Sequence, residues 1–408
     1  MIKVEQLNND AYCVGKIDDR GVPFHRLILE KGTTYNSYLL KTKKPTIIDT
    51  VDMMFGRSYI EKLSELINLE DIQYIVINHT EPDHSGALGS LALRAKNATI
   101  VCTEPAVYEL KEMYKLQNRN FLVVKDGDKL DIGGKTLIFK LTPYLHTKET
   151  MVTYCVEDKA LFSCDIFSTH VAVKDYFNDT CGFDITEDFI GYYNAIMKPH
   201  ASYVRYMLNA IKDLDIKMIC PSHGFIIRKD ADKFIKIYDD LSQVNNSNKK
   251  VVIAYTTLRQ NTKKIAEMFR DLISNNNIEV LLFNADKTPA DEIIKAIEDA
   301  DVALFGTSTR YGDMVGNMEV LLKLLEGKDL KGKIAGAFGS FGWSGEGIEI
   351  IQDYLNKTNM TVLNTSSIIK STGMNDVEFP VRVRFSINDS EAEKIRRAAY
   401  YIVDLLLS

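Results

Sequence analysis

A polar stretch at residues 241–250 separates two different patterns of hydrophobicity. Its sequence, LSQVNNSNKK, follows a helical pattern at 231–241 and precedes a strongly apolar run at 251–255. Such a change in composition is typical of a linker between domains. A chain of 408 residues is also long enough for two or three domains. We therefore predict one domain over residues 1–245 and a second over 250–408.

Downstream of this linker, short apolar runs alternate with segments of helical periodicity. The runs are VVIAY, EVLLF, VALFG and IAGAFG, and helices are expected over 262–273, 290–299 and 390–407. This alternation is typical of βαβ units, in which helices cover both faces of a parallel sheet. The pattern predicts a doubly wound α/β domain.

Upstream of the linker, the predicted strands come in groups, with a few helices between the groups. The strand-like runs are HRLILE, TYNSYLL, PTIID, YIVIN, ATIVC, NFLVV, TLIFKL, MVTYCV and ALFSC. Strands that follow one another in this way favour an α+β arrangement, here a β-sandwich flanked by helices.

Composition and charge argue against several classes of protein. A net charge of −6 disfavours a nucleic-acid-binding surface, which needs clustered Lys and Arg. The chain has no run of about 18 apolar residues, and MIKVEQLNNDAY lacks the features of a signal peptide, so we expect a cytoplasmic protein without membrane association. Its six cysteines are scattered without a C-x-x-C pair, which argues against a disulfide framework or a zinc ribbon.

Four residues of metal-binding type occur within six positions, directly after a predicted strand. The run IQYIVIN is followed at once by HTEPDH, which contains His79, Glu81, Asp83 and His84. Such side chains repel or desolvate one another unless a cation compensates, and sites are often built on loops at strand ends. The alternative is a solvated polar loop. We predict that this segment binds metal.

Three further strand ends each contain one residue of the same type. They are His146 in YLHT, Asp165 in FSCDIF and His223 in CPSHG. Taken singly, a histidine here is more often structural, and Asp165 is equally explained as a helix cap. The order of the three segments behind HTEPDH favours a shared metal site.

A second group of loops follows strands in the C-terminal half. VVIAY leads into TTLRQNT, VALFG into TSTRYGD, and IAGAFG into SFGWSGE. Hydroxyls and backbone N–H groups at a helix N-terminus bind phosphate, although Thr-rich segments are also ordinary helix caps. The first loop resembles that of flavodoxins, with Gln260 in place of the usual Gly, and TRYGD resembles a loop of some FMN quinone reductases.

In a flavodoxin-like sheet with strand order 2-1-3-4-5, these loops surround the crevice that holds FMN. The exposed aromatic side chains Tyr311 and Trp343 are candidates for stacking on the flavin ring, the alternative being ordinary core packing. The candidate FMN-binding residues are Thr257, Leu258, Arg259, Gln260, Asn261, Thr262, Ser308, Thr309, Arg310, Tyr311, Gly312, Ser340, Phe341, Gly342, Trp343, Ser344 and Gly345.

The metal-binding segments resemble the metallo-β-lactamase superfamily, whose signature is a strand followed by H-x-H-x-D-H, then a His, a bridging Asp and a last His. Glu81 stands here where the hydrolases have their second His. A carboxylate added to each metal's imidazoles favours a redox-active iron centre over zinc. With the flavin-type domain behind it, the chain resembles flavodiiron proteins, or A-type flavoproteins, over nearly its whole length.

This resemblance implies a metallo-β-lactamase-like αββα sandwich followed by a flavodoxin-like domain, with two irons and one FMN. One iron is then held by His79, Glu81 and His146, the second by Asp83, His84 and His223, and Asp165 bridges them. Whether His84 is a metal ligand stays open, because water replaces the matching histidine in some members of the family. His25 and His170 are candidates for supporting positions, and for both a structural or surface role is an equal alternative. For His200 the structural reading is favoured.

The resemblance also implies an oxidoreductase that reduces O2 to water, NO to N2O, or both. Because no C-x-x-C pair is present to hold a rubredoxin-type iron, electrons are expected from a separate donor such as rubredoxin. No G-x-G-x-x-G follows a strand, which argues against direct use of NAD(P)H. A head-to-tail homodimer, or a dimer of dimers, is expected by analogy. The alternatives are a zinc-dependent hydrolase with an accessory flavodoxin-like module and a noncatalytic redox sensor.

Overall fold

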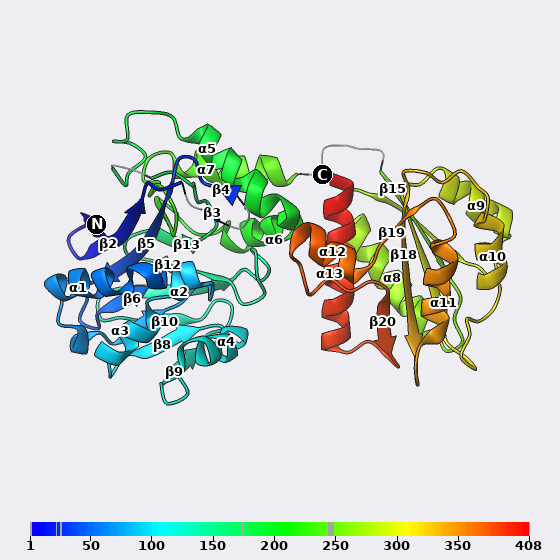
Figure 1. Ribbon diagram of the computed structural model, residues 1–408, viewed down its shortest axis with the longest axis horizontal. Coiled ribbons are helices and arrows are strands. Elements are labelled where there is room, and N and C mark those ends of the chain that lie inside the picture. The colour runs from blue at the N-terminus through cyan, green and yellow to red at the C-terminus, as the bar shows by residue number, and fades with distance from the viewer. Residues whose placement is uncertain (1, 22, 25–26, 173–174, 244–248, 408) are drawn as a thin grey trace. The chain divides into compact units, whose positions relative to one another are not determined.

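The computed structural model describes residues 2–407 except 22, 25–26, 173–174 and 244–248. The chain divides into two compact units, Met1–Gln243 and Val244–Ser408. Each unit has its own sheet structure and its own helical layers (Figure 1).

The first unit is built on two sheets. The larger has the strand order β1 (Ile2–Gln6), β2 (Ala11–Asp18), β5 (Thr33–Leu40), β6 (Thr46–Ile48), β7 (Tyr74–Val76), β8 (Thr99–Cys102) and β9 (Phe121–Val123). The smaller has the order β10 (Lys129–Asp131), β11 (Thr136–Leu141), β12 (Met151–Cys155), β13 (Ala160–Cys164) and β14 (Met218–Pro221). The sheets pack face to face, with the rings of Tyr38 and Phe162 5.0 Å apart.

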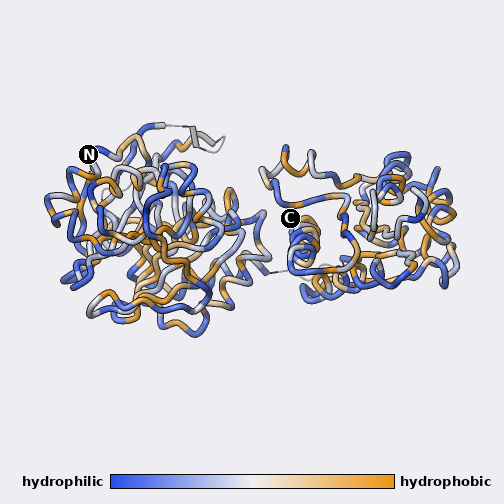
Figure 2. The backbone as a smooth tube through the Cα atoms, turned by 90° about the horizontal axis from the view of Figure 1, so that it is seen from below, coloured by the Kyte–Doolittle hydropathy of each residue, from blue (hydrophilic) through white to orange (hydrophobic). Residues whose placement is uncertain are grey.

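Helices cover the outer faces of both sheets and complete an αββα sandwich, as predicted (Figure 1). On the larger sheet lie α1 (Gly56–Leu66), α3 (Leu88–Arg94) and α4 (Glu104–Tyr114), whose apolar side chains share one core with those of the strands. The unit also contains α5 (Thr186–Tyr192), α6 (Ala201–Ile211) and α7 (Ala231–Ser242), with the π-helix η3 (Tyr193–Met197) and the 3-10 helix η4 (Lys198–His200) between α5 and α6. In Figure 2, which is coloured by residue hydropathy, hydrophobic residues are concentrated in the interior of this unit.

Several sequence-based details differ in the structure. Within the run HRLILE the structure describes the strand β4 (Leu27–Ile28), which pairs with β3 (Pro23–Phe24), and residues 25–26 lie outside the described part of the chain. Strands β1 and β2 were not among the predicted strands. The HTEPDH segment is not all loop, because it contains the short helix α2 (Pro82–Ser85), and a proline at a first helical position needs no N–H there.

The second unit is a single parallel sheet. Its order is β16 (Glu279–Asn284), β15 (Lys250–Tyr255), β17 (Val302–Ser308) and β18 (Ile334–Phe341), followed by two short strands that both pair with β18. These are β19 (Thr361–Val362), beside the start of β18, and β20 (Val381–Arg384), beside its end. Counted as one interrupted fifth strand, they complete the predicted order 2-1-3-4-5.

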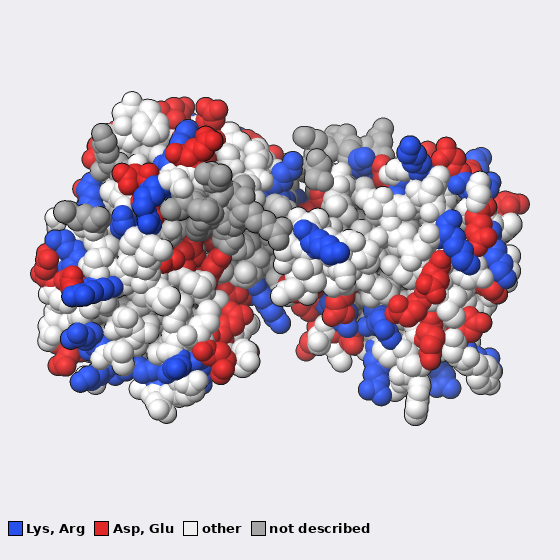
Figure 3. Space-filling model, in the orientation of Figure 1, with Lys and Arg blue, Asp and Glu red and all other residues white. Residues whose placement is uncertain are grey.

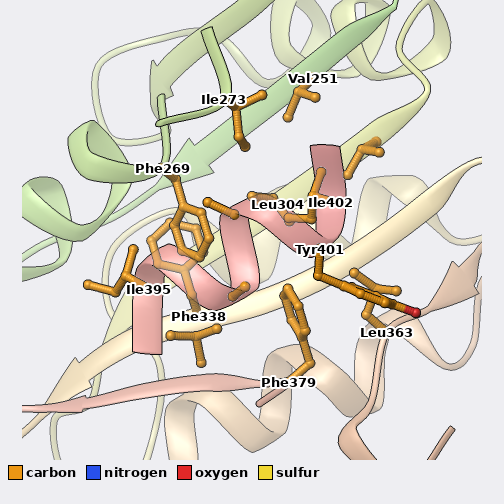
Figure 4. Packing of buried hydrophobic residues seen from close by; sticks show 14 of the residues in the cluster. Val251, Phe269, Ile273, Leu304, Phe338, Leu363, Phe379, Ile395, Tyr401 and Ile402 are labelled. Carbon is orange, nitrogen blue, oxygen red and sulfur yellow. The ribbon is translucent and has the colours of Figure 1, made fainter. Parts of the chain in front are cut away.

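The helices of the second unit are α8 (Asn261–Ser274), α9 (Ala290–Glu298), α10 (Met318–Leu325), α11 (Glu346–Leu355), α12 (Thr365–Thr372) and α13 (Asp389–Leu407). Helices α8, α9 and α13 lie within one or two residues of their predicted bounds. Figure 4 shows one face of the sheet packed against α8 and α13, where the rings of Phe269 and Phe338 are 5.4 Å apart. A second cluster, with α9, α10 and α11, covers the other face.

All six cysteines are free, and five of them are buried, as expected for small apolar side chains. On the face drawn in Figure 3, basic and acidic side chains are interspersed over each unit. Within the described part of the chain, no helix combines the length and the apolar character needed to cross a membrane.

Candidate functional site

The predicted metal-binding residues lie in four connections that follow strands of the first unit. His79, Glu81, Asp83 and His84 come after β7, and His146 lies between β11 and β12. Asp165 directly follows β13, and His223 lies two residues beyond β14. Because β13 and β14 are parallel neighbours, their carboxyl ends meet at the same edge of the sheet. The structure brings all seven side chains together there.

The first group consists of His79, Glu81 and His146, with one oxygen of Asp165. His79 Nε2 and His146 Nε2 both lie 3.2 Å from Glu81 Oε2. The same two nitrogens lie 3.6 and 3.3 Å from Asp165 Oδ2. Four donor atoms therefore converge on one small volume.

The second group consists of Asp83, His84 and His223, with the other oxygen of Asp165. Asp83 Oδ2 lies 3.3 Å from His84 Nε2 and 3.2 Å from His223 Nε2. Asp165 Oδ1 lies 3.3 and 3.4 Å from these two nitrogens. The ring of His84 thus points into the group, and the two oxygens of Asp165 face different groups.

The chemistry of these side chains fits a pair of cations. Both carboxylate oxygens of Asp83, both ring nitrogens of His84 and Asp165 Oδ2 are buried without a hydrogen-bond partner among the described residues. Burial opposes protonation of His223, but the adjacent Asp165 and Asp83 raise its pKa to about 10. His146 is likewise opposed by burial, and Asp165 and Glu81 raise its pKa to about 9. The carboxylates therefore impose a field that favours positive charge at both groups.

Supporting hydrogen bonds orient the candidate ligands, and sequence reasoning missed all of them. His79 Nδ1 lies 2.7 Å from Glu149 Oε1, and His223 Nδ1 donates to Thr34 O at 2.6 Å. Tyr192 donates its hydroxyl to Asp165 Oδ1 at 2.7 Å. Glu149, Tyr192 and Thr34 carry no local sequence pattern that marks them as partners of the candidate ligands.

Further side chains close around the second group. Cys164 Sγ lies within 4.8 Å of donor atoms of His84 and Asp165, and burial raises the pKa of this thiol well above its usual value. Gly224, next to His223, has a φ of +74°, and a Cβ there would lie 1.8 Å from Thr169 Oγ1. A side chain at this position is therefore incompatible with the observed path of the His223 loop.

The other histidines have different positions. His170 Nδ1 lies 3.0 Å from Thr33 Oγ1, and its ring centroid is 5.1 Å from that of His223, so His170 borders the second group. His200 is buried, with its ring 6.3 Å from that of His146. His25 lies outside the described residues.

The three predicted flavin loops meet at the carboxyl edge of the sheet in the second unit. The hydroxyl of Thr262 lies 2.9 Å from Ser308 Oγ and 2.8 Å from Ser340 Oγ, which joins all three loops. Gln260 precedes α8 with a φ of +65°, the left-handed conformation for which flavodoxins use Gly. The hydroxyl oxygens of Thr257 and Thr309 are buried without a hydrogen-bond partner among the described residues.

A cavity of about 230 Å³ lies between these loops. Its lining is Leu258, Arg259, Asn261, Ser308, Thr309, Ser340, Phe341, Gly342 and Phe385. The unpartnered hydroxyls and the N-terminus of the 14-residue helix α8 fit an anionic group such as the phosphate of FMN. The cavity and its hydroxyls therefore suit the predicted cofactor.

The remaining predicted flavin residues lie in the same loops but not in the lining of this cavity. Trp343 and Tyr311 are 94% and 91% exposed, so neither is a core aromatic. Sequence reasoning missed Phe385, which directly follows β20 and has a φ of +64°. Phe385 was missed because the alternating sequence VRVR before it was not predicted to be a strand.

Comparisons with known proteins agree with this architecture. A family model described as ODP family beta lactamase matches residues 33–224, and a flavodoxin model matches residues 253–391. The anaerobic nitric oxide reductase flavorubredoxin of Vibrio vulnificus is 34% identical over 354 residues, which cover 85% of this chain and 71% of that protein. This chain belongs to the flavodiiron protein family. An uncharacterized Methanocaldococcus jannaschii protein, MJ0732, is also 34% identical, over 89% of this chain and 92% of its own length.

Solved structures of flavodiiron proteins resemble the whole chain. The protein from Giardia intestinalis has a TM-score of 0.57 and 27% identity, covering 100% of this chain and 98% of its own. The rubredoxin oxygen:oxidoreductase of Desulfovibrio gigas has a TM-score of 0.57 and 26% identity, covering 99% and 98%. The predicted family, fold and cofactors, FMN and a diiron site, are thereby confirmed, as is the prediction of an oxidoreductase. The zinc hydrolase alternative is not favoured.

Proposed function

We propose that this flavodiiron protein reduces O2 to water, NO to N2O, or both. The proposal is carried by the position of Asp165, whose two carboxylate oxygens face two different groups of imidazole and carboxylate donors. In this assignment His79, Glu81 and His146 hold one iron, Asp83, His84 and His223 hold the other, and Asp165 bridges them. When bound, the iron pair supplies two adjacent coordination positions and redox equivalents for a diatomic substrate.

The protein's own residues set the conditions for that chemistry. Three carboxylates, those of Glu81, Asp83 and Asp165, offset most of the charge of a diferrous pair, which lowers the cost of holding it in a largely buried site. His79, His84 and His223 are at most 1% exposed, so the protein excludes bulk water from their side of the site. Tyr192 holds one oxygen of Asp165 through its hydroxyl.

For FMN we propose the loop residues predicted above, with Phe385 added. The support is the cavity between the loops and the unpartnered hydroxyls of Thr257 and Thr309. Electrons are proposed to come from a separate rubredoxin-type carrier. Relatives whose names include flavorubredoxin and rubredoxin oxygen:oxidoreductase support that donor.

Gas consumption tests this proposal. Reduced, iron-replete protein with a rubredoxin donor system is expected to consume O2 or NO at many turnovers, with little peroxide released from O2. Product analysis for N2O and peroxide assigns the reaction. A protein that carries both cofactors but turns over neither gas would contradict the proposal and would favour a noncatalytic redox sensor.

We also propose a head-to-tail homodimer, in which one subunit's FMN serves the partner's irons. The support is that the metal-binding loops and the flavin loops belong to different compact units of one chain. An Asp165→Asn variant mixed with a Thr257→Val/Thr309→Val variant, each low in activity alone, should regain activity on subunit exchange. A monomer by sedimentation, with no regain of activity, would contradict this arrangement.

The domain limits 1–245 and 250–408 are proposed as independent folding units. Cores on both faces of the second sheet consist wholly of residues after 250, which supports this division. A fragment 250–408 is expected to fold and bind FMN but not to reduce O2 rapidly to water. Rapid peroxide-free O2 consumption by the fragment would show that the diiron role is wrong.

A further inference from the structure

The His79 ring has a buried carboxylate behind it. His79 Nε2 faces Glu81 and Asp165, while its other nitrogen, Nδ1, lies 2.7 Å from Glu149 Oε1. The side chain of Glu149 is only 2% exposed. Glu149 comes from the connection between β11 and β12, and His79 follows β7, so the contact joins the two sheets of the sandwich.

Several donors hold the Glu149 side chain in place. Oε1 also accepts the hydroxyl of Thr147 at 2.8 Å and the backbone N–H of Thr80 at 3.2 Å, and it lies 2.9 Å from Thr80 Oγ1. The Thr103 hydroxyl donates to the Glu149 backbone carbonyl at 2.7 Å. This many contacts on one carboxylate oxygen leave the side chain little rotational freedom.

The partners behind the two imidazoles differ in kind. Behind His79 lies the carboxylate side chain of Glu149, 2.7 Å from Nδ1. The equivalent position behind His223 differs, because His223 Nδ1 donates to a neutral backbone carbonyl, Thr34 O. One imidazole of each group therefore has a different kind of partner, a carboxylate side chain in the first group and a backbone carbonyl in the second.

We propose that Glu149 is a positioning residue that fixes the Nδ1–H tautomer of His79 and makes this histidine a stronger donor than His223. A hydrogen bond to a carboxylate raises the basicity of a metal-bound imidazole and orients its ring. The iron held by the first group then binds more tightly and is more stable in the ferric state. This inference rests on the proposed ligand assignment and extends it to inequivalent irons.

The test compares Glu149→Gln with Glu109→Gln in the full-length chain. Glu109 is a matched control, since its carboxylate accepts the Thr80 hydroxyl at 2.5 Å and it is not one of the proposed ligands. Glu149→Gln should weaken one metal of the pair by about 10–100-fold in a chelator competition, whereas Glu109→Gln should change neither metal by more than about twofold. Far-UV circular dichroism and thermal unfolding of the metal-free variants report whether the first unit keeps its fold.

Spectroscopy separates positioning from general destabilisation. In ⁵⁷Fe-loaded protein, Glu149→Gln should alter one Mössbauer doublet and leave the other unchanged, and the first iron should become easier to reduce. Glu149→Asp keeps the carboxylate but places it one methylene further from His79. Its effect on the spectrum should therefore lie between wild type and the Gln variant. Unaltered affinity and unaltered doublets in the Gln variant would overturn the proposal, as would equal changes in both doublets.

Two controls keep the result interpretable. If Glu149→Gln does not fold, Glu149→Asp must show the same one-doublet change at smaller size, and an unchanged spectrum there overturns the proposal. Repeating the competition with Co²⁺ makes the outcome independent of the native metal. A wild-type protein that binds fewer than two metals would contradict the proposed ligand set instead, so the two failures are distinguishable.

Discussion

The metal-binding site and the flavin site use different kinds of side chain. The metal-binding group uses ionisable side chains from four separate connections, and five of its seven members are at most 6% exposed. The flavin cavity uses short hydroxyl side chains and a helix N-terminus, with aromatic side chains as exposed as Trp343 beside it. Removing one ligand from the first site leaves buried charge uncompensated, whereas removing one contact from the second leaves the rest of the cavity intact.

The largest expected effect comes from Asp165→Asn, which removes the carboxylate shared by both metal groups. Iron should fall well below two per chain, and O2 or NO turnover should drop at least about a hundredfold, equivalent to about 2.7 kcal/mol in barrier. FMN should remain stoichiometric, because its loops lie in the other unit. Asp213→Asn, at an exposed position, serves as the control. Full iron content in Asp165→Asn would show that loss of one ligand is tolerated at the metal site as well as at the flavin site.

Glu81→His should have the next largest effect. It restores the H-x-H-x-D-H pattern and removes one anionic oxygen, so the site should favour zinc over iron. We expect a flavin-replete protein with much less iron and with turnover reduced at least about tenfold, or about 1.4 kcal/mol. Metal analysis and gas assays check this, and undiminished iron with normal turnover would remove Glu81 from the ligand set.

The metal-binding site and the flavin site also differ in how far they could be predicted from the sequence. Very few side-chain types bind metals, so the HTEPDH segment and three strand ends predicted a group that the structure does bring together. Phe385 was missed because β20 depends on pairing with β18 across an insertion that contains α12. Glu149 and Tyr192 were missed because their importance arises only from tertiary contacts. The bounds of α8, α9 and α13 were predictable because the hydrophobic periodicity there is regular, whereas the strand order of the second unit followed from the resemblance to flavodoxins.

A smaller effect is expected at Thr257, whose buried hydroxyl has no hydrogen-bond partner among the described residues. If FMN provides that partner, Thr257→Val should weaken FMN binding about tenfold, in line with about 1.5 kcal/mol for one hydrogen bond. Iron content should not change. The matched control is Thr358→Val, at the opposite edge of the sheet, where the hydroxyl already donates to Leu355 O. Unchanged FMN affinity, measured by fluorescence titration, would argue against the phosphate assignment.

The smallest effect is expected from Trp343→Leu. Because the side chain is 94% exposed, the free energy of unfolding of the flavin-free protein should change by less than about 0.5 kcal/mol. FMN affinity should fall about 2–10-fold if the indole stacks on the flavin, since aromatic contacts contribute about 0.5–1.5 kcal/mol. Calorimetry and fluorescence titration give the two values. A loss of stability without a loss of FMN affinity would show that Trp343 has a structural role.

The metal and flavin content of the full-length chain, expressed with ample iron and purified without oxygen, tests the central claim most directly. The ligand set and the flavin loops predict about two irons and one FMN per chain, with the irons coupled through the Asp165 bridge in the Mössbauer spectrum. Stoichiometric zinc without flavin under the same conditions would contradict the assignment of both sites.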